Sequence, residues 1–176
     1  ETLDATATRA MAVLDPVKLI LTNWDDVMGA GFLDDCVAPI HPHDPNRGQR
    51  HFTMGREVWI DRSDFQEQPP KGFFRLYPGN NVRLKYGHII TCTGCTKDAN
   101  GRITSIQATL IPDTKSGTPG SASIKVKGVI TWVGVMDAIP AQLRLYSHLF
   151  TDAQPDAGGK DFLASLNPNS LQVVNA

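Results

Sequence analysis

Alternation of apolar and polar residues with a period of two runs through most of this chain. It covers 17–24, 57–60, 82–93, 103–111, 124–133 and 142–145, segments that are rich in β-branched and aromatic residues. Successive side chains of a strand point to opposite faces of a sheet, so this pattern predicts strands that each bury one face. No long helical pattern interrupts them. The sequence therefore predicts an all-β fold, in which a closed or nearly closed antiparallel barrel limits the exposed strand edges.

Turn signals indicate how these strands connect. Asp98-Ala99-Asn100-Gly101 predicts a tight hairpin, because Asn-Gly tolerates the positive φ that such turns require. A longer loop over 112–123 leads to a third strand, so we expect a meander. Short helical turns are expected at 62–65 and 160–166, the second capped by Asp161, and 151–160 is expected to be a mobile loop.

Composition indicates a folded domain and excludes binding by bulk charge. Hydrophobic residues make up 41% of the chain, charged residues 20%, and the formal net charge is −1. Any binding of a polyanion must therefore rely on a local patch. Six cations and two anions lie between Gln66 and Thr104, a balance of +4, whereas Trp24 to Asn46 holds five aspartates and no lysine or arginine. This asymmetry can orient a polyanion, although solubility alone also explains it.

Motifs for chemistry are sparse. The three cysteines Cys36, Cys92 and Cys95 are an odd number, which favours a reducing cytoplasm over a disulfide framework. Cys92 and Cys95 have the spacing of a zinc or redox pair, but no second C-x-x-C follows. A metal site using these two cysteines and His41 is therefore a weak alternative. No nucleophile elbow, phosphate loop or membrane-length apolar run is present, so we assign no catalytic residue and expect no membrane partner.

A mixture of cations and rings marks the segment PPKGFFRLYPGNNVRLK at 69–85. Guanidinium groups bind phosphates or base edges, and flat rings stack on unpaired bases, so the segment suits single-stranded RNA. Aromatic residues beside Pro-Gly turns are, however, most often core residues, and alternating cations most often form a solvated strand face. The residues in question are Lys71, Phe73, Phe74, Arg75, Tyr77, Arg83 and Lys85.

A resemblance to a known family covers nearly the whole chain. RAMAVLDPVKL at 9–19 is similar to the signature that opens the anticodon-binding half of bacterial-type glutaminyl-tRNA synthetases. Five further blocks resemble that family in the expected order. They are GREVWIDRSDF at 55–65, PPKGFFRLYPGNNVRL at 69–84, KVKGVITWV at 125–133, LRLYSHLF at 143–150 and DFLASLNPNSLQVV at 161–174.

The resemblance implies roles in anticodon binding for particular side chains. Arg9 resembles the arginine that helps recognise the middle uridine, Arg75 the one that meets the third-position guanine, and Arg83 the one at the first-position base. Lys85 is implied to contact the RNA backbone, and Lys71 and His43 are further implied tRNA-binding residues. An arginine fork can donate two hydrogen bonds to guanine, which agrees with such roles. Gly72 and Phe74 replace longer polar or basic side chains of some relatives, so the resemblance assigns no contact to these two positions.

The resemblance also implies how the chain is organised and what it works with. Residues 1–136 are expected to form a first anticodon-binding barrel of the ribosomal-protein-like type, with 1–16 as the junction to a catalytic half that lies before Glu1. Residues 137–176 are expected to form part of a second barrel, left with an open edge after Leu145. The implied partners are the tRNA(Gln) anticodon loop and the catalytic half of a class I glutamine-tRNA ligase, which would hold ATP and Mg. No DNA partner, and no cofactor in this part, is expected. The alternative is a stand-alone RNA-binding barrel without catalytic activity.

Overall fold

The computed structural model describes residues 2–176, which divide into two compact units. The first unit extends to Ala138 and the second comprises Ile139–Ala176. The expected assignment of 1–136 and 137–176 to a first and a second barrel stays a prediction.

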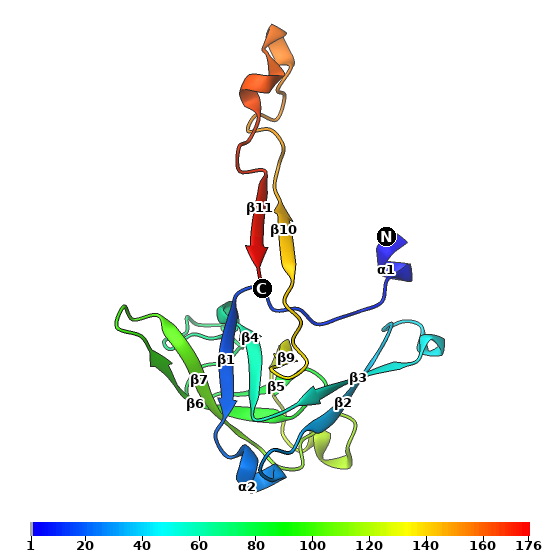
Figure 1. Ribbon diagram of the computed structural model, residues 1–176, viewed down its shortest axis with the longest axis vertical. Coiled ribbons are helices and arrows are strands. Elements are labelled where there is room, and N and C mark those ends of the chain that lie inside the picture. The colour runs from blue at the N-terminus through cyan, green and yellow to red at the C-terminus, as the bar shows by residue number, and fades with distance from the viewer. Residues whose placement is uncertain (1) are drawn as a thin grey trace. The chain divides into compact units, whose positions relative to one another are not determined.

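A seven-stranded sheet forms the first unit, with strand order β8-β5-β6-β7-β1-β4-β9 (Figure 1). The strands at its two ends are consecutive in sequence and only Thr131 separates them. The segment formed by β8 and β9 thus pairs with β5 through β8 and with β4 through β9, which brings the two ends of the sheet together. The predicted all-β barrel is confirmed. Its strands are β1 (Pro16–Leu21), β4 (Glu57–Asp61), β5 (Asn81–Leu84), β6 (Ile89–Lys97), β7 (Ile103–Leu110), β8 (Gly128–Ile130) and β9 (Trp132–Gly134).

The core of this barrel follows the sequence alternation. In β1, Val17, Leu19 and Leu21 are buried while the residues between them are partly exposed. β4 alternates in the same way, with Val58 and Ile60 inside. Burying one face of each strand removes apolar area from water. Each Å² of apolar area buried contributes roughly 25 cal/mol to the stability, and this is the main stabilisation of such a fold.

The predicted hairpin joins β6 to β7. The Asp98 carboxylate accepts hydrogen bonds from the backbone N–H groups of Asn100 and Arg102, at 2.9 and 2.8 Å. Gly101 has a φ of 79°, a conformation that glycine adopts without steric cost. The strands on either side pair antiparallel, which confirms the prediction.

Strand connectivity differs from the expected meander. β7 pairs with β1, in parallel, and the segment after the long loop returns to β5, also in parallel. The expected strand at 82–93 is two strands, because the chain turns at 85–88, where Tyr86 has a φ of 65°. Residues 124–127 precede the strand expected there, and Trp24 begins a helix instead of ending a strand. Alternation reports which side chains are buried, whereas pairing depends on contacts distant in sequence.

A second hairpin, which the pattern did not reveal, extends from the barrel. It consists of β2 (Asp34–Pro39) and β3 (Gln49–Met54), paired antiparallel. The helices are short: α1 (Thr2–Thr6), α2 (Trp24–Met28) and the 3-10 helices η1 (Pro45–Arg47), η2 (Arg62–Asp64), η3 (Pro119–Ala122), η4 (Ala157–Gly159) and η5 (Phe162–Ser165). Two helical turns were predicted close to η2 and η5, and the Asp161 carboxylate caps η5 by accepting from Leu163 N at 3.0 Å. No helix among residues 2–176 has the length and apolar character to cross a bilayer.

The second unit is built on a two-stranded antiparallel ribbon of β10 (Gln142–Tyr146) and β11 (Leu171–Asn175), drawn in Figure 1 in orange and red. As expected, it forms no closed barrel within the described residues. Several of its large apolar side chains are exposed, among them Tyr146 at 74% and Leu163 at 57%. Two-stranded ribbons are marginally stable in water by themselves. The mobility of 151–160 stays a prediction.

Candidate nucleic-acid interface

Arg9 lies where the N-terminal segment meets the end of the β2–β3 hairpin. Its backbone N–H donates to Ile40 O at 2.9 Å, and its guanidinium binds the Asp4 carboxylate at 2.6 Å. Arg47 donates from the hairpin loop to Thr6 O at 2.5 Å. His43 is exposed in the same loop, with its ring edge-on to the buried His41. The structure thus brings Arg9 and His43 to one end of this hairpin.

Arg75 forms an ion pair with Asp64. The Asp64 side chain is only 4% exposed, whereas that of Arg75 is 53% exposed. The loop that carries Arg75 is pinned beside η2, because Leu76 N donates to Asp64 O at 2.9 Å. Arg75 therefore neutralises a buried carboxylate and still presents part of its guanidinium to solvent. The predicted contact with a guanine is not tested by this arrangement and stays a prediction.

Arg83 is engaged with the long loop at 112–123. From β5, its Nη1 donates to Thr114 O at 2.7 Å and to Gly87 O at 3.0 Å, and its Nη2 donates to Ser121 O at 2.5 Å. Partial burial lowers the pKa of this guanidinium from its ordinary value. Most of the donor fork thus binds protein carbonyls. Arg83 therefore holds this loop against β5. A base contact at this residue stays a prediction.

Lys85 and Lys71 are exposed and lie outside every ion pair among residues 2–176. Lys85 Nζ lies 5.5 Å from the centre of the Tyr86 ring. Sequence reasoning missed other cations of the same kind. Those of the first unit are Lys125 and Lys127. The alternation predicts that the KVKG block, which holds both lysines, is part of a strand, but these two residues precede β8. The signal available in the sequence was a pair of lysines in a stretch without any acidic residue between Asp113 and Asp137.

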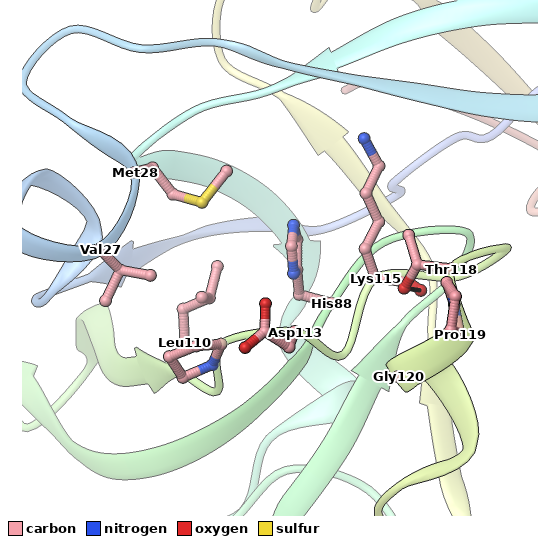
Figure 2. Close-up of a pocket in the computed structure, with 10 residues that line it drawn as sticks. Val27, Met28, His88, Leu110, Asp113, Lys115, Thr118, Pro119 and Gly120 are labelled. Carbon is pink, nitrogen blue, oxygen red and sulfur yellow. Dashed lines mark hydrogen bonds between the residues drawn. The ribbon is translucent and has the colours of Figure 1, made fainter.

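A separate cavity of about 500 Å³ lies between α2, the end of β7 and the loop at 112–123 (Figure 2). The His88 ring lines it and is 4% exposed. His88 Nε2 lies 3.0 Å from Asp34 Oδ2, and Lys115 Nζ binds the other oxygen of that carboxylate at 2.7 Å. His88 Nδ1 is buried without a hydrogen-bond partner among the described residues. Burial lowers the pKa of His88 below its ordinary value of 6.5, although Asp34 acts in the opposite direction.

Acidification is expected to destabilise the first unit through His88. Because the pKa of His88 is lower in the folded state, the unfolded chain binds more protons than the folded chain below pH 6.5. The contribution of neutral His88 to the free energy of unfolding is therefore fully present above pH 6.5. It is lost as the pH falls toward the folded-state pKa. The slope for one proton is at most about 1.4 kcal/mol for each pH unit. Urea unfolding at several pH values between 7.5 and 5 measures it. His88→Gln should make the dependence of stability on pH shallower. It should not abolish this dependence, because the other four histidines remain. Identical slopes in the two proteins would contradict this role.

The cysteine pair has none of the features of a reactive thiol site. Cys92 is buried, and burial raises the pKa of its thiol to about 11. Thiols of high pKa remain protonated at neutral pH and react slowly. Among residues 2–176 no three His, Cys, Asp or Glu side chains gather in a way that could hold a metal ion.

Comparison with known proteins decides the family. Residues 7–111 match the family described as tRNA synthetases class I (E and Q), anti-codon binding domain, and residues 129–176 match a second family of the same description. The chain belongs to this family. The resemblance first seen in RAMAVLDPVKL is thereby confirmed, and the predicted cations lie on an anticodon-binding domain of class I.

Relatives agree over almost the whole chain. A glutamine-tRNA ligase of Ralstonia nicotianae is 59% identical over 174 residues, which is 99% of this chain and 29% of the relative. Those of Bordetella pertussis and Cupriavidus necator are 57% and 55% identical, with the same coverage of both chains. The chain thus spans somewhat under a third of the curated relatives that it matches. The alternative of a stand-alone barrel is not favoured, because these relatives are glutamine-tRNA ligases.

Proposed function

We propose that this chain binds the anticodon loop of tRNA(Gln) as part of a glutamine-tRNA ligase. The match to the class I anticodon-binding family over both units carries the proposal. In the parent enzyme, the catalytic half would use ATP and Mg to attach glutamine to the tRNA, and this chain would supply recognition. Its proposed location is the cytoplasm, in agreement with the three unpaired cysteines.

The charge arrangement supports a reader of a few bases more than a general RNA binder. The net charge is −1, and many cations are neutralised by carboxylates. Recognition must therefore use a small number of well-placed groups, such as the exposed part of Arg75. Phosphate contacts would come from the unpaired lysines.

Titration of the chain with tRNA(Gln) tests the proposal. We expect tighter binding to a transcript with a CUG anticodon than to the same transcript with the anticodon of tRNA(Glu). Binding should weaken as salt rises, since each phosphate contact releases counterions and contributes about 0.7 to the slope of log K against log salt for a single strand. Equal affinities for the two transcripts at both a low and a near-physiological salt concentration would show that this chain does not read the anticodon.

A further inference from the structure

A polar groove of about 370 Å³ lies in the first unit between the loop before β5 and the segment before β8. It is distinct from the cavity beside His88, with which it shares no residue. The six residues to which the resemblance assigns tRNA binding do not line it, whereas Phe74 and Tyr77 of the segment at 69–85 do. The side chains that matter to its chemistry are Phe74, Tyr77, Asn80, Asn81, Lys125 and Lys127.

The walls of this groove are held in place by backbone contacts. Gly79 N donates to Cys92 O at 2.8 Å, and Cys92 N donates to Asn80 O at 3.0 Å, so the loop is tied to β6. On the other wall, Gly128 pairs with Val82 of β5. A Cβ at Gly128 would overlap the carbonyl oxygen of Phe74, which shows how closely the two walls approach there. A groove with fixed walls loses little entropy when it binds a ligand.

Both lysines of the groove are exposed and without a carboxylate partner among residues 2–176. Lys127 Nζ lies 4.9 Å from the centre of the Phe74 ring, which is itself 53% exposed. An ammonium group beside an exposed ring can bind a phosphate while the ring stacks on a base. In the part of the chain that the structure describes, no acidic side chain lines the groove. Its charge therefore favours an anion.

The two asparagines have hydrogen-bonding capacity to spare. Asn80 Nδ2 donates to Arg75 O at 2.8 Å, and Asn81 Oδ1 accepts from Thr91 Oγ1 at 2.8 Å. Within residues 2–176, Asn80 Oδ1 and Asn81 Nδ2 form no hydrogen bond, and one is an acceptor and the other a donor. A base edge presents donors and acceptors of both kinds. The groove thus holds a ring for stacking, cations for a phosphate and amides for a base edge or ribose.

We propose that this groove binds one nucleotide of the tRNA, with its base against Phe74 and its phosphate at Lys125 and Lys127. This inference rests on the proposed function, since the ligand is the same tRNA. It adds a contact that none of the six residues assigned to tRNA binding by the resemblance supplies. Because Asn80 binds the carbonyl of Arg75, a nucleotide here would lie next to the loop that carries that arginine.

The test compares the wild-type chain with Lys125→Gln/Lys127→Gln in titrations with a tRNA(Gln) transcript over a range of salt. The slope of log K against log salt should become shallower by about 0.7 for each phosphate that the variant no longer neutralises. The matched control is Lys18→Gln/Lys97→Gln, which removes the same charge from lysines that are already paired with Glu57 and Glu67. We expect the control to keep the wild-type slope.

Phe74→Leu separates stacking from charge. It retains apolar volume and the charge of the groove, so affinity should fall by at least about 5-fold while the salt slope stays unchanged. Phe74→Trp should preserve the affinity, and the fluorescence of the added tryptophan should be quenched when the tRNA binds. Thermal melts check that each variant is folded.

The outcomes distinguish this inference from the proposed function. A wild-type chain that binds tRNA(Gln) while the groove and control double variants have equal affinities and slopes overturns the groove site alone. A wild-type chain that does not prefer the cognate anticodon contradicts the proposed function instead. A shallower slope in the groove variant, together with weaker binding by Phe74→Leu, supports the site.

Discussion

Replacing Trp132 with alanine is expected to lower the free energy of unfolding of the first unit by about 3–5 kcal/mol, the range for removing a large buried aromatic side chain. Trp132 is fully buried, and the centre of its ring lies 5.4 Å from the centre of the Phe52 ring. Its Nε1 donates to Lys85 O at 2.9 Å, a bond that the alanine variant cannot form. The residue lies on β9, at the point where the two ends of the sheet meet.

Urea unfolding followed by circular dichroism measures this loss. Trp59→Ala is the matched control, because it makes the same chemical change on β4 at a partly exposed side chain that lies beside Lys18. We expect a clearly smaller loss for the control. Comparable losses in the two variants would mean that Trp132 does not act through its burial at the closure of the barrel.

Replacing Arg75 with alanine is expected to damage both stability and recognition. Asp64 is buried at 4% exposure and Arg75 is its ion-pair partner, so the variant leaves an unpaired carboxylate inside the protein. The cost of such an unsatisfied group is about 1–3 kcal/mol. If Arg75 also donates two hydrogen bonds to the third anticodon base, discrimination at that base falls by a further 1–3 kcal/mol, roughly.

Arg75→Lys separates the two effects. Lysine retains the positive charge beside Asp64 but lacks the planar fork that matches guanine. We therefore expect near wild-type stability in urea, together with a reduced preference for guanine at the third anticodon position when transcripts with each base are titrated. A lysine variant that keeps the full preference would refute the predicted base contact and leave Arg75 with a purely structural role.

Much of the fold was predictable because it depends on local patterns. Burial of Val17, Leu19 and Leu21 follows from alternation, and the β6–β7 hairpin follows from the Asn-Gly turn. The parallel pairing of β7 with β1 was not predictable in this way, since it joins residues that are more than eighty positions apart. The β2–β3 hairpin was missed because its strands lie in or near an acidic segment without a clear alternation.

The candidate site was predictable in its residue types but not in its availability. The sequence placed Arg75, Arg83 and Lys85 together in one segment. Arg83 lies on β5 and Lys85 directly follows it, whereas Arg75 lies in the loop before this strand. It did not indicate that Arg75 neutralises Asp64 or that Arg83 binds the carbonyls of a distant loop. Lys125 and Lys127 escaped notice because their groove forms only when the segment before β8 reaches the loop before β5.

The sequence by itself determined the burial pattern, the main turn and the family, since each of these depends on residues that are neighbours along the chain. The tertiary structure alone decided which charges remain free. Asp34 of the acidic segment is neutralised by Lys115, and Asp25 by Arg56, while Arg75 of the basic segment is neutralised by Asp64. Charge counted along a chain therefore differs from charge on its surface, because ion pairs form between residues that folding brings together.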